Sequence, residues 1–437
     1  MSEQELQLPK GWVKAKLEDI TELIGGGTPS RKIPEYFDGD IVWLTPTEIS
    51  KNTITVISDS REKITELGLK KSSAKIIPKD SVLLTSRASI GYVAISGGNV
   101  TTNQGFASFI CSNVILNYFL AYWLWSKKTF LESEATGTTF KEISKSKLRD
   151  IIILIPPLNE QKRIISKIEE LFSNIDSTKQ SLEQTKLQLE LYRYSLLKDA
   201  YEKLVEKHES YSLNDLCLKI TDGEHFKPKF IETGIPFVSA KDISETGLVF
   251  DNAKYVSKDD AKKFRLKCNP EQNDILMVSR GIVGRTCLVD TKESFCLLGS
   301  VILLKPNKTI KSKFLNNYLN LASVQNALVK LSSSTVQGAI YLRDLKKTTI
   351  PLPSLQEQEQ IVSKIEQGFS LIENTQNIIN STLQTLQTMK MSVLQHAFEG
   401  KLVPQDPNDE PAQILLEKIK STKEAQPAKK RRAKNVK

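Results

Sequence analysis

The sequence predicts a mixed α/β protein, with two α/β domains and two long coiled-coil helices that form an internal repeat. Three observations support this prediction. The chain resembles itself at an offset of 197 residues, which is too long for a solenoid and fits a duplicated half-protein. Two regions contain short apolar runs between turn residues. Two others carry an apolar heptad pattern that continues for more than four heptads.

The repeat is clearest where the two helices are expected to begin. The segment "PPLNEQKRIISKIEELF" starts at Pro156, and "SLQEQEQIVSKIEQGF" starts at Ser354. Residues 155–176 and 352–373 are identical at 12 of 22 aligned positions. The globular regions agree mainly in the positions of their expected strands and turns, whereas the helices agree residue by residue. We therefore expect the helices to share one task and the globular domains to have diverged.

Length and charge indicate a multi-domain protein. At 437 residues the chain is long enough for several separate cores. Its 61 Lys and Arg residues exceed its 51 Asp and Glu residues, which gives a net charge of +10. A surplus of this size fits a polyanionic partner such as nucleic acid, or simply high solubility.

The cysteines predict neither a disulfide framework nor a zinc site. There are five, they form no CxxC pair, and they lie mostly in apolar runs: Cys111, Cys217, Cys268, Cys287 and Cys296. This pattern indicates buried thiols in a reducing compartment. The N-terminus has no apolar signal core, and no stretch approaches the roughly 18 apolar residues of a membrane span. We therefore expect a cytoplasmic protein without a membrane contact.

The first globular region, from Gly11 to Leu154, is predicted to be α/β. Its β-type runs are "DIVWLTP", "KIIPKDSVLLTS", "ASIGYVAIS" and "GFASFICS". One aromatic-rich helix is expected at Asn117–Ser133, and its composition is typical of a buried core helix. The same α/β pattern returns from Leu213 to Thr349.

Each long helix is predicted to carry one apolar seam. The seam residues are Ile168, Ile175, Leu182, Leu189 and Leu196 in the first copy, and Ile365, Ile372, Ile379, Leu386 and Val393 in the second. The other core position turns polar toward the C-terminal end, and polar interruptions of this kind can fix register and partner. About 44 residues of helix span roughly 66 Å. Because a lone helix of this type needs a partner, we expect each helix to pair with its own repeat.

The chain from Pro404 has a different composition. A proline- and acid-rich connector and a short helix lead to a basic end, "KEAQPAKKRRAKNVK". This end fits a solvated disordered tail, a phosphate-binding arm or a nuclear import signal.

A search for catalytic motifs gives little. "GGGTPSRK" at Gly25–Lys32 lacks the second Gly-Lys pair of a phosphate loop. The three histidines are scattered, and the Asn/Asp-Pro-Pro-aromatic tetrad of amino-methyltransferases is absent. Asp260 and Lys262 have no partner carboxylates for a Mg²⁺ nuclease and fit a helix surface. The sequence therefore predicts a non-catalytic chain with no metal site.

Paired polar loops remain as candidate ligand contacts. "TSRASIG" at Thr85–Gly91 and "VSRGIVG" at Val278–Gly284 each place Ser-Arg after an apolar strand. Arg87 and Arg280 suit a bidentate contact to guanine or a phosphate clamp, and they equally suit a salt bridge across the turn.

Two further loop pairs carry hydroxyl, amide and cationic side chains. "ATGTTFKEIS" matches "SSTVQGAIYLRDL", and "GGGTPSRK" matches "TDGEHFKPK". They suit phosphate and base-edge contacts, although such loops are also common as plain turns. The candidate DNA-binding residues are Thr28, Ser30, Arg31, Lys32, Arg87, Ser89, Thr138, Thr139, Lys141, Lys227, Lys229, Lys241, Arg280, Gln337, Tyr341 and Arg343.

The order of these features resembles the specificity subunit of type I restriction-modification systems. The two helix openings carry the resemblance, together with the N-terminal "LPKGW" and the exit sequence "GKLVPQDPNDEPA". It extends over essentially the whole chain. It implies target-recognition domains at 1–154 and 208–351, spacer helices at 155–207 and 352–403, and a connector, short helix and basic tail at 404–437.

The resemblance also implies a function and partners. Each domain would recognise one half of a split target in double-stranded DNA. The helices would pack antiparallel with pseudo-twofold symmetry, fix the gap and dock two methyltransferase (modification) subunits. S-adenosylmethionine would belong to those partners, and ATP and Mg²⁺ to motor-nuclease (restriction) subunits, so this chain would hold no cofactor.

Two alternatives come from other classes of protein. A coiled-coil scaffold or adaptor without DNA specificity explains the helices, but not the duplicated and diverged domains. A nuclease or methyltransferase with a divergent site has no motif in its favour.

Overall fold

The computed structural model describes residues 8–137, 141–226, 228–244, 247–251, 253–333 and 338–425. The chain divides into two compact units, Met1–Gln180 with Leu383–Lys437 and Ser181–Thr382. We call them unit 1 and unit 2. Two long helices, α6 (Leu158–Tyr201) and α13 (Leu355–Phe398), each contribute to both units.

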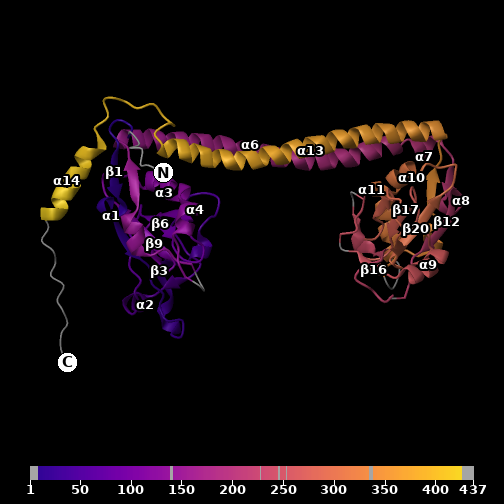
Figure 1. Ribbon diagram of the computed structural model, residues 1–437, viewed down its shortest axis with the longest axis horizontal. Coiled ribbons are helices and arrows are strands. Elements are labelled where there is room, and N and C mark those ends of the chain that lie inside the picture. Colours follow the sequence, from indigo (N-terminus) through magenta and orange to yellow (C-terminus); the bar gives the residue numbers. More distant parts are fainter. Residues whose placement is uncertain are drawn as a thin grey trace. The chain divides into compact units, whose positions relative to one another are not determined.

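Unit 1 contains a five-stranded sheet of order β2-β9-β6-β7-β4, a three-stranded sheet of order β5-β3-β8 and the pair β1-β10 (Figure 1). Its strands are β1 (Val13–Lys16), β2 (Thr21–Gly25), β3 (Phe37–Leu44), β4 (Thr55–Ile57), β5 (Lys63–Ile64), β6 (Val82–Thr85), β7 (Val93–Ser96), β8 (Thr101–Thr102), β9 (Phe106–Cys111) and β10 (Ile152–Ile155). Its shorter helices are α1 (Leu17–Ile20), η1 (Pro34–Tyr36), η2 (Pro46–Glu48), α2 (Glu66–Lys70), α3 (Asn117–Ser126), α4 (Lys128–Ser133), α5 (Lys145–Asp150) and α14 (Ala412–Ala425).

Unit 2 contains a four-stranded sheet of order β12-β20-β17-β18, a three-stranded sheet of order β16-β13-β19 and the pairs β11-β21 and β14-β15. Its strands are β11 (Ser210–Ser212), β12 (Cys217–Asp222), β13 (Ile235–Val238), β14 (Ile243–Ser244), β15 (Gly247–Leu248), β16 (Lys254–Val256), β17 (Ile275–Val278), β18 (Thr286–Leu288), β19 (Cys296–Leu297), β20 (Val301–Pro306) and β21 (Thr349–Pro351). Its shorter helices are α7 (Leu204–Lys207), α8 (Leu213–Leu216), η3 (Ala240–Asp242), α9 (Lys258–Lys267), α10 (Ser312–Leu319), α11 (Ala322–Ser333) and α12 (Leu342–Leu345).

The central strand of each main sheet is buried along its whole length. Every residue of β6 and of β17 is buried, as expected for short apolar runs covered on both faces. β6 pairs antiparallel with β9, and β17 pairs antiparallel with β20. Each central strand leads directly into a Ser-Arg turn. The sheets therefore place the two Ser-Arg turns at equivalent positions in the two units.

The aromatic segment at Asn117–Ser133 forms two helices and not the single helix that the sequence predicts. Lys127 separates α3 from α4, with φ −91° and ψ 9°. The Ser126 hydroxyl donates to the Trp123 carbonyl at 2.7 Å, which competes with regular helical hydrogen bonding. The six central residues of α3 are buried, as expected of a core helix.

A buried glutamine joins each long helix to a globular domain. In unit 1 the amide of Gln161 donates to the carbonyls of Val114 at 2.8 Å and Pro156 at 3.0 Å, and accepts from the Leu116 N–H at 2.8 Å. Its side chain is fully buried, so these bonds satisfy groups that water cannot reach.

Gln358 repeats this junction in unit 2. Its amide donates to the carbonyls of Thr309 at 3.1 Å and Pro353 at 2.9 Å, and accepts from the Lys311 N–H at 2.8 Å. The preceding glutamates are also equivalent. Glu160 accepts from the Trp12 indole at 3.0 Å, and Glu357 lies 3.3 Å from the His208 imidazole. The repeated Glu-Gln pair is therefore the contact between helix and domain.

The C-terminal end of the other helix completes each junction. In unit 1 the ring of Phe398, at the end of α13, packs edge-on against Phe119 of α3 with centroids 5.3 Å apart. In unit 2 the ring of Tyr201, at the end of α6, packs against Phe314 of α10 at 5.0 Å. Each globular domain thus contacts the start of one long helix and the end of the other.

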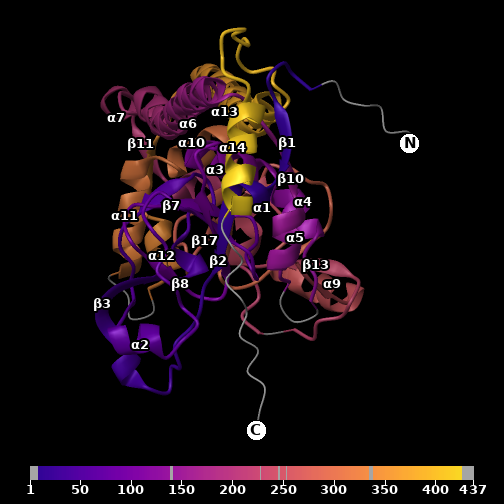
Figure 2. The same ribbon diagram turned by 90° about the vertical axis from the view of Figure 1, so that its left-hand side faces the viewer.

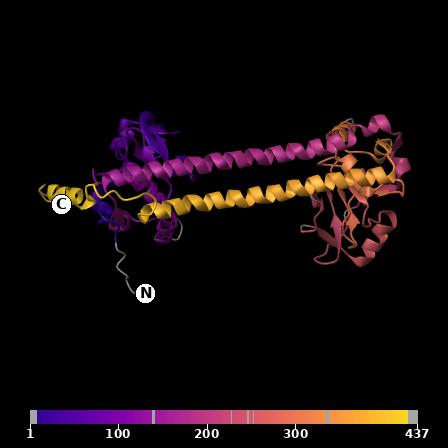
Figure 3. The ribbon, with the colours of Figure 1, turned by 90° about the horizontal axis from the view of Figure 1, so that it is seen from above.

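Within each unit the two long helices lie side by side and run antiparallel (Figure 3). Six of the ten predicted seam residues are buried, and Leu182, Leu189, Leu196 and Val393 are half-buried. Cations at the polar core positions lie over phenylalanine rings, Lys390 over Phe172 at 5.0 Å in unit 1 and Arg193 over Phe369 at 4.5 Å in unit 2. The 197-residue offset converts one pair into the other.

The exit sequence returns to the N-terminal opening of the chain. Asp409 pairs with Arg163 of α6 at 2.7 Å, and the Ala412 N–H donates to the Gly11 carbonyl at 3.1 Å. Helix α14 then packs near α1, with Leu416 buried (Figure 2). The two terminal motifs of the family resemblance therefore form one contact. The basic end from residue 426 lies outside the described residues.

We expect Gln161→Leu and Gln358→Leu each to lower the free energy of unfolding of the affected unit by about 2–4 kcal/mol. Leucine has similar volume but leaves one N–H and two carbonyls buried without partners, at about 1–3 kcal/mol each before relaxation. Urea denaturation followed by circular dichroism measures the change. Gln180→Leu, at an exposed site on α6, is the matched control. Equal stability of Gln161→Leu and the control would contradict the role of the junction.

Candidate nucleic-acid interface

Three loops meet around one cavity in unit 2. The cavity has a volume of about 550 Å³ and is lined by Asp222 and His225 from the first loop, Ser279 and Arg280 from the Ser-Arg turn, and residues 339–343 from the third loop. The sequence selected all three loops as separate candidates. The fold brings them together at the ends of β12 and β17.

Backbone hydrogen bonds hold the three loops of unit 2 in place. The Glu224 N–H donates to the Leu297 carbonyl at 2.7 Å, and the Ser279 N–H donates to the Ser300 carbonyl at 2.9 Å. The Ile340 N–H donates to the Ser279 carbonyl at 3.0 Å. Since only main-chain groups take part, the frame does not depend on which side chains the loops carry.

Unit 1 has the same frame. The Gly27 N–H donates to the Thr102 carbonyl at 2.8 Å, the Ser86 N–H to the Gly105 carbonyl at 2.8 Å, and the Ile143 N–H to the Ser86 carbonyl at 3.0 Å. The loops around Gly25, Arg87 and Lys141 are therefore neighbours here as well.

Glycine is required where the first loop crosses the neighbouring strand. A Cβ atom on Gly26 would overlap the Asn103 carbonyl oxygen, and one on Gly223 would overlap the Leu297 carbonyl oxygen. Only glycine permits so close an approach of two backbones. The Gly-rich segment of unit 1 thus has a structural role that needs no bound phosphate.

The two Ser-Arg turns differ in charge. In unit 1 the Nε of Arg87 lies 3.7 Å from Glu142, which is the salt bridge that the sequence left as one of two possibilities. In unit 2 Arg280 is exposed, and no carboxylate in the described part of the chain lies within salt-bridge distance of it. Arg280 can therefore accept an anionic or hydrogen-bonding ligand without losing an ion pair.

A chain of hydrogen-bonded polar groups borders the unit 2 cavity. The His225 Nε2 lies 2.8 Å from Asp222, and Lys267 donates to the other carboxylate oxygen of Asp222 at 3.0 Å. Burial alone would raise the pKa of Asp222, but the hydrogen bonds from Lys267 and His225 outweigh it and lower that pKa. Asp222 is thus a carboxylate, and it fixes the imidazole at the rim of the cavity.

Arg31 is exposed, yet its guanidinium is occupied. It makes two hydrogen bonds to Glu62, at 2.9 and 2.7 Å, and lies over the rings of Phe37 and Trp43 at 5.3 and 5.5 Å. The hydrogen bond from Arg31 lowers the pKa of Glu62. The expected basic surface of this loop is therefore carried by Lys32, whose side chain is exposed.

The remaining candidates occupy varied positions. Thr28 is half-buried, and its hydroxyl donates to the Gln104 amide oxygen. Exposed side chains belong to Ser30, Ser89, Lys141, Lys229, Lys241, Tyr341 and Arg343. Four candidates lie outside the described residues: Thr138, Thr139, Lys227 and Gln337.

Comparison with known proteins identifies the family. The profile described as "Type I restriction modification DNA specificity domain" matches residues 9–187 and again residues 206–384. The chain belongs to this family. The two matches agree with the internal repeat, since each covers one globular domain and the first part of the long helix that follows it.

Individual relatives of this specificity subunit support the assignment over most of its length. The chain is 29% identical over 393 residues to the type I restriction enzyme MjaIX specificity subunit of Methanocaldococcus jannaschii, covering 85% of this chain and 90% of the relative. It is 26% identical over 464 residues to the EcoKI specificity subunit of Escherichia coli K12, covering 97% and 98%. The HsdS subunit structure from Thermoanaerobacter tengcongensis shares the fold, with a TM-score of 0.62, 20% identity and coverage of 92% and 100%.

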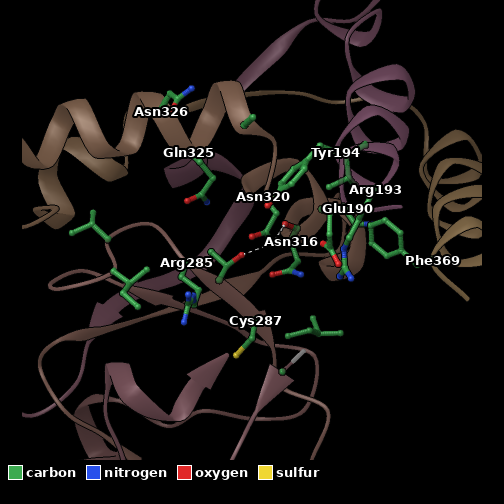
Figure 4. Close-up of a pocket in the computed structure, with 18 of the residues that line it drawn as sticks. Glu190, Arg193, Tyr194, Arg285, Cys287, Asn316, Asn320, Gln325, Asn326 and Phe369 are labelled. Atoms are coloured by element: carbon green, nitrogen blue, oxygen red, sulfur yellow. Dashed lines mark hydrogen bonds between the residues drawn. The ribbon is translucent and has the colours of Figure 1, made fainter. Parts of the chain in front are cut away.

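A second cavity in unit 2 of the specificity subunit escaped the sequence analysis. It has a volume of about 540 Å³ and lies between α6, α10 and β18, with Asn316, Asn320, Arg193 and Phe369 among its lining residues (Figure 4). In unit 1 the residue equivalent to Phe369 is Phe172. There the rings of Tyr122 and Trp125 of α3 pack edge-on against Phe172, with centroids 5.9 and 5.8 Å apart.

The described residues contain no group of three or more His, Cys, Asp or Glu that could hold a metal ion. In the same part of the chain, none of the helices has the length and hydrophobicity to cross a membrane. The five cysteines are free thiols, of which Cys268, Cys287 and Cys296 are buried and Cys111 and Cys217 are half-buried. Burial raises the pKa of the Cys111 thiol to about 12, so this thiol is unreactive at neutral pH.

Three residues of the interface were missed: Gln104, Asp222 and His225. A signal was available for the last, because the 197-residue offset places His225 opposite Thr28, which the sequence did select. Asp222 lies in a loop that the sequence did select, three residues before His225. Gln104 had no such signal, since it meets Thr28 only when loops 76 residues apart in the chain come together.

We expect Gly281→Ala to destabilise unit 2 by about 1 kcal/mol, because Gly281 has a φ of +90° and an alanine there is strained although nothing else lies near its Cβ position. Gly98→Ala is the matched control, with the same open surroundings and no positive φ. Thermal unfolding monitored by calorimetry measures both variants. If Gly281→Ala melts like Gly98→Ala, the turn is not strained as described. Ala88, at the equivalent position of unit 1, tolerates a φ of +61°.

Proposed function

We propose that each globular domain of this specificity subunit recognises one half of a bipartite target in double-stranded DNA. One observation carries the proposal: the same main-chain frame occurs in both units, with different side chains at the point where its three loops meet. A shared frame with divergent contact groups is what two unlike half-sites require. Arg280, which has no carboxylate within salt-bridge distance among the described residues, and the net charge of +10 add the electrostatic attraction that DNA binding needs.

The proposal assigns the chemistry to partner subunits. Two methyltransferase subunits would dock on the paired helices and carry S-adenosylmethionine. Motor-nuclease subunits would use ATP and Mg²⁺ in the full complex, which would act in the cytoplasm. The chain itself would bind, position and select DNA without catalysing a reaction. The MjaIX and EcoKI relatives, which are named as specificity subunits of restriction enzymes, support this division of tasks.

The long helices would fix the distance between the two half-sites. A 44-residue helix spans about 66 Å. Half-sites in successive major-groove segments lie about 34 Å apart. A helix of this length can hold two domains at that order of separation once the overhang of the domains is subtracted from the helix length. The paired seam and the cation–aromatic contacts give the helices the stiffness that a fixed gap requires, whereas a flexible linker would tolerate many gap lengths.

We expect Arg280→Ala to weaken binding of the target duplex in a gel-shift assay. If Arg280 contacts guanine, discrimination at one base pair falls by about 1–3 kcal/mol. If it contacts phosphate, affinity falls for all sequences and the salt dependence becomes shallower by about 0.9 in the logarithmic slope. Lys198→Ala, which removes one exposed charge from α6, is the control. Unchanged affinity and unchanged salt dependence for Arg280→Ala would refute its contact with DNA.

We expect removal of one heptad from each helix, residues 180–186 and 380–386, to shorten the spacer by about 10 Å, or near three base pairs. The variant should lose the original target or accept a shorter gap. Methylation mapping with the methyltransferase partner, on DNA libraries that vary the gap, gives the result. An unchanged preferred gap would rule out the spacer function while leaving half-site recognition intact.

A further inference from the structure

One pair of side chains occupies the same place in the two frames but differs in chemistry. In unit 1 Thr28 meets Gln104, and the threonine hydroxyl donates to the amide oxygen. In unit 2 the equivalent positions are His225 and Gly299, and the imidazole lies so close to Gly299 that a Cβ there would collide with it. We call these two positions the variable pair.

The variable pair lies at the centre of the shared frame. One residue before Thr28, the Gly27 N–H bonds to the Thr102 carbonyl, and one residue after Gln104, the Gly105 carbonyl receives the Ser86 N–H. In unit 2 the Glu224 and Ser300 main-chain bonds flank His225 and Gly299 in the same manner. The pair thus joins the first loop to the Ser-Arg turn in both units.

The amide of Gln104 is presented outward. The side chain is exposed, and its oxygen accepts one hydrogen bond from Thr28. A carboxamide oxygen has two lone pairs, so a second acceptor site and both N–H groups of Gln104 are available to a ligand. The hydroxyl of Thr28 fixes the rotation of the amide, which lowers the entropic cost of a bidentate contact.

We propose that Gln104 is the residue with which the first domain recognises an adenine in the major groove. The amide oxygen accepts from the adenine N6 amino group, and the amide nitrogen donates to N7, a pairing that only adenine offers in this geometry. Thr28 acts as a positioning residue. The inference rests on the proposed function and adds to it the base that is read and the residue that reads it.

The second domain makes a different contact at the same place. His225 is held by Asp222, which itself pairs with Lys267, and Gly299 contributes no side chain. An imidazole above a bare backbone cannot form the bidentate amide pair. The two half-sites should therefore differ at the base pair facing the variable pair, even though the frames match.

The test uses the full chain with its methyltransferase partner. The target is first mapped by sequencing methylated genomic DNA, and binding is then measured by gel shift on duplexes that each change one base pair. Gln104→Ala should lose roughly ten- to a hundredfold of discrimination at one A·T pair of one half-site. Gln104→Glu, which keeps the size of the side chain, should shift that position toward C·G, because a carboxylate accepts from the cytosine amino group.

Controls separate base reading from other effects. Thr28→Val should weaken the same discrimination, and Thr28→Ser should restore it. Gln272→Ala, at an exposed site in the turn before β17 of unit 2, should change nothing. Equal loss of affinity on every duplex, or unchanged preference in both Gln104 variants, would overturn the assignment to adenine. A wild-type complex with no sequence preference would instead reject the proposed function itself.

Discussion

The structure depends on two buried glutamines. Gln161 and Gln358 each satisfy one N–H and two carbonyl groups at the boundary between a globular domain and a long helix. A carboxamide offers one acceptor oxygen and two N–H donors in a single plane, so it satisfies all three groups without placing a charge in the interior. Glutamates beside them hold the first residues of each domain. Burial raises the pKa of Glu160, and the Trp12 indole partly offsets that effect. In unit 1 the start of α6, the segment at Val114 and Leu116 and the N-terminal segment at Trp12 therefore meet at this junction.

The two halves of the chain become less alike with increasing distance from the glutamine junction. The glutamine junction makes the same three hydrogen bonds at equivalent positions in both units, although Val114 and Leu116 of unit 1 are replaced by Thr309 and Lys311 in unit 2. The aromatic contact behind it is similar but pairs Phe398 with Phe119 in one unit and Tyr201 with Phe314 in the other. The three loops keep their main-chain bonds and the Ser-Arg pair of the turn, but they differ in most of their other side chains. Constraint is therefore strongest where side chains are buried, and side-chain chemistry varies most where the loops face solvent.

Periodicity and the repeat were sufficient to predict the two α/β domains, the long helices and most of the seam, because hydrophobic spacing records which residues become buried. The two Ser-Arg turns do follow buried strands, as predicted. Sequence could not decide whether Arg87 is paired, since Glu142 approaches it only through the fold. It likewise gave no sign of the break at Lys127 or of the Asp222–His225 contact, although both are local: the Ser126 hydroxyl bonds to the Trp123 carbonyl, and Asp222 and His225 are three residues apart. Arg31, selected as a candidate DNA contact, pairs with Glu62, which lies 31 residues away in the chain.

The main-chain frame has an evolutionary consequence. Because backbone groups hold the loops, an exchange of Thr28, Gln104 or His225 costs little folding energy. On the assignment proposed above, a lineage would change its DNA target through a few point mutations, without passing through unfolded intermediates. The close approach of the His225 ring to Gly299 sets one limit on this freedom, since a larger residue at position 299 requires a smaller one opposite. Residues at two facing positions of this kind are therefore expected to change together, because a substitution at one position requires a compensating substitution at the other.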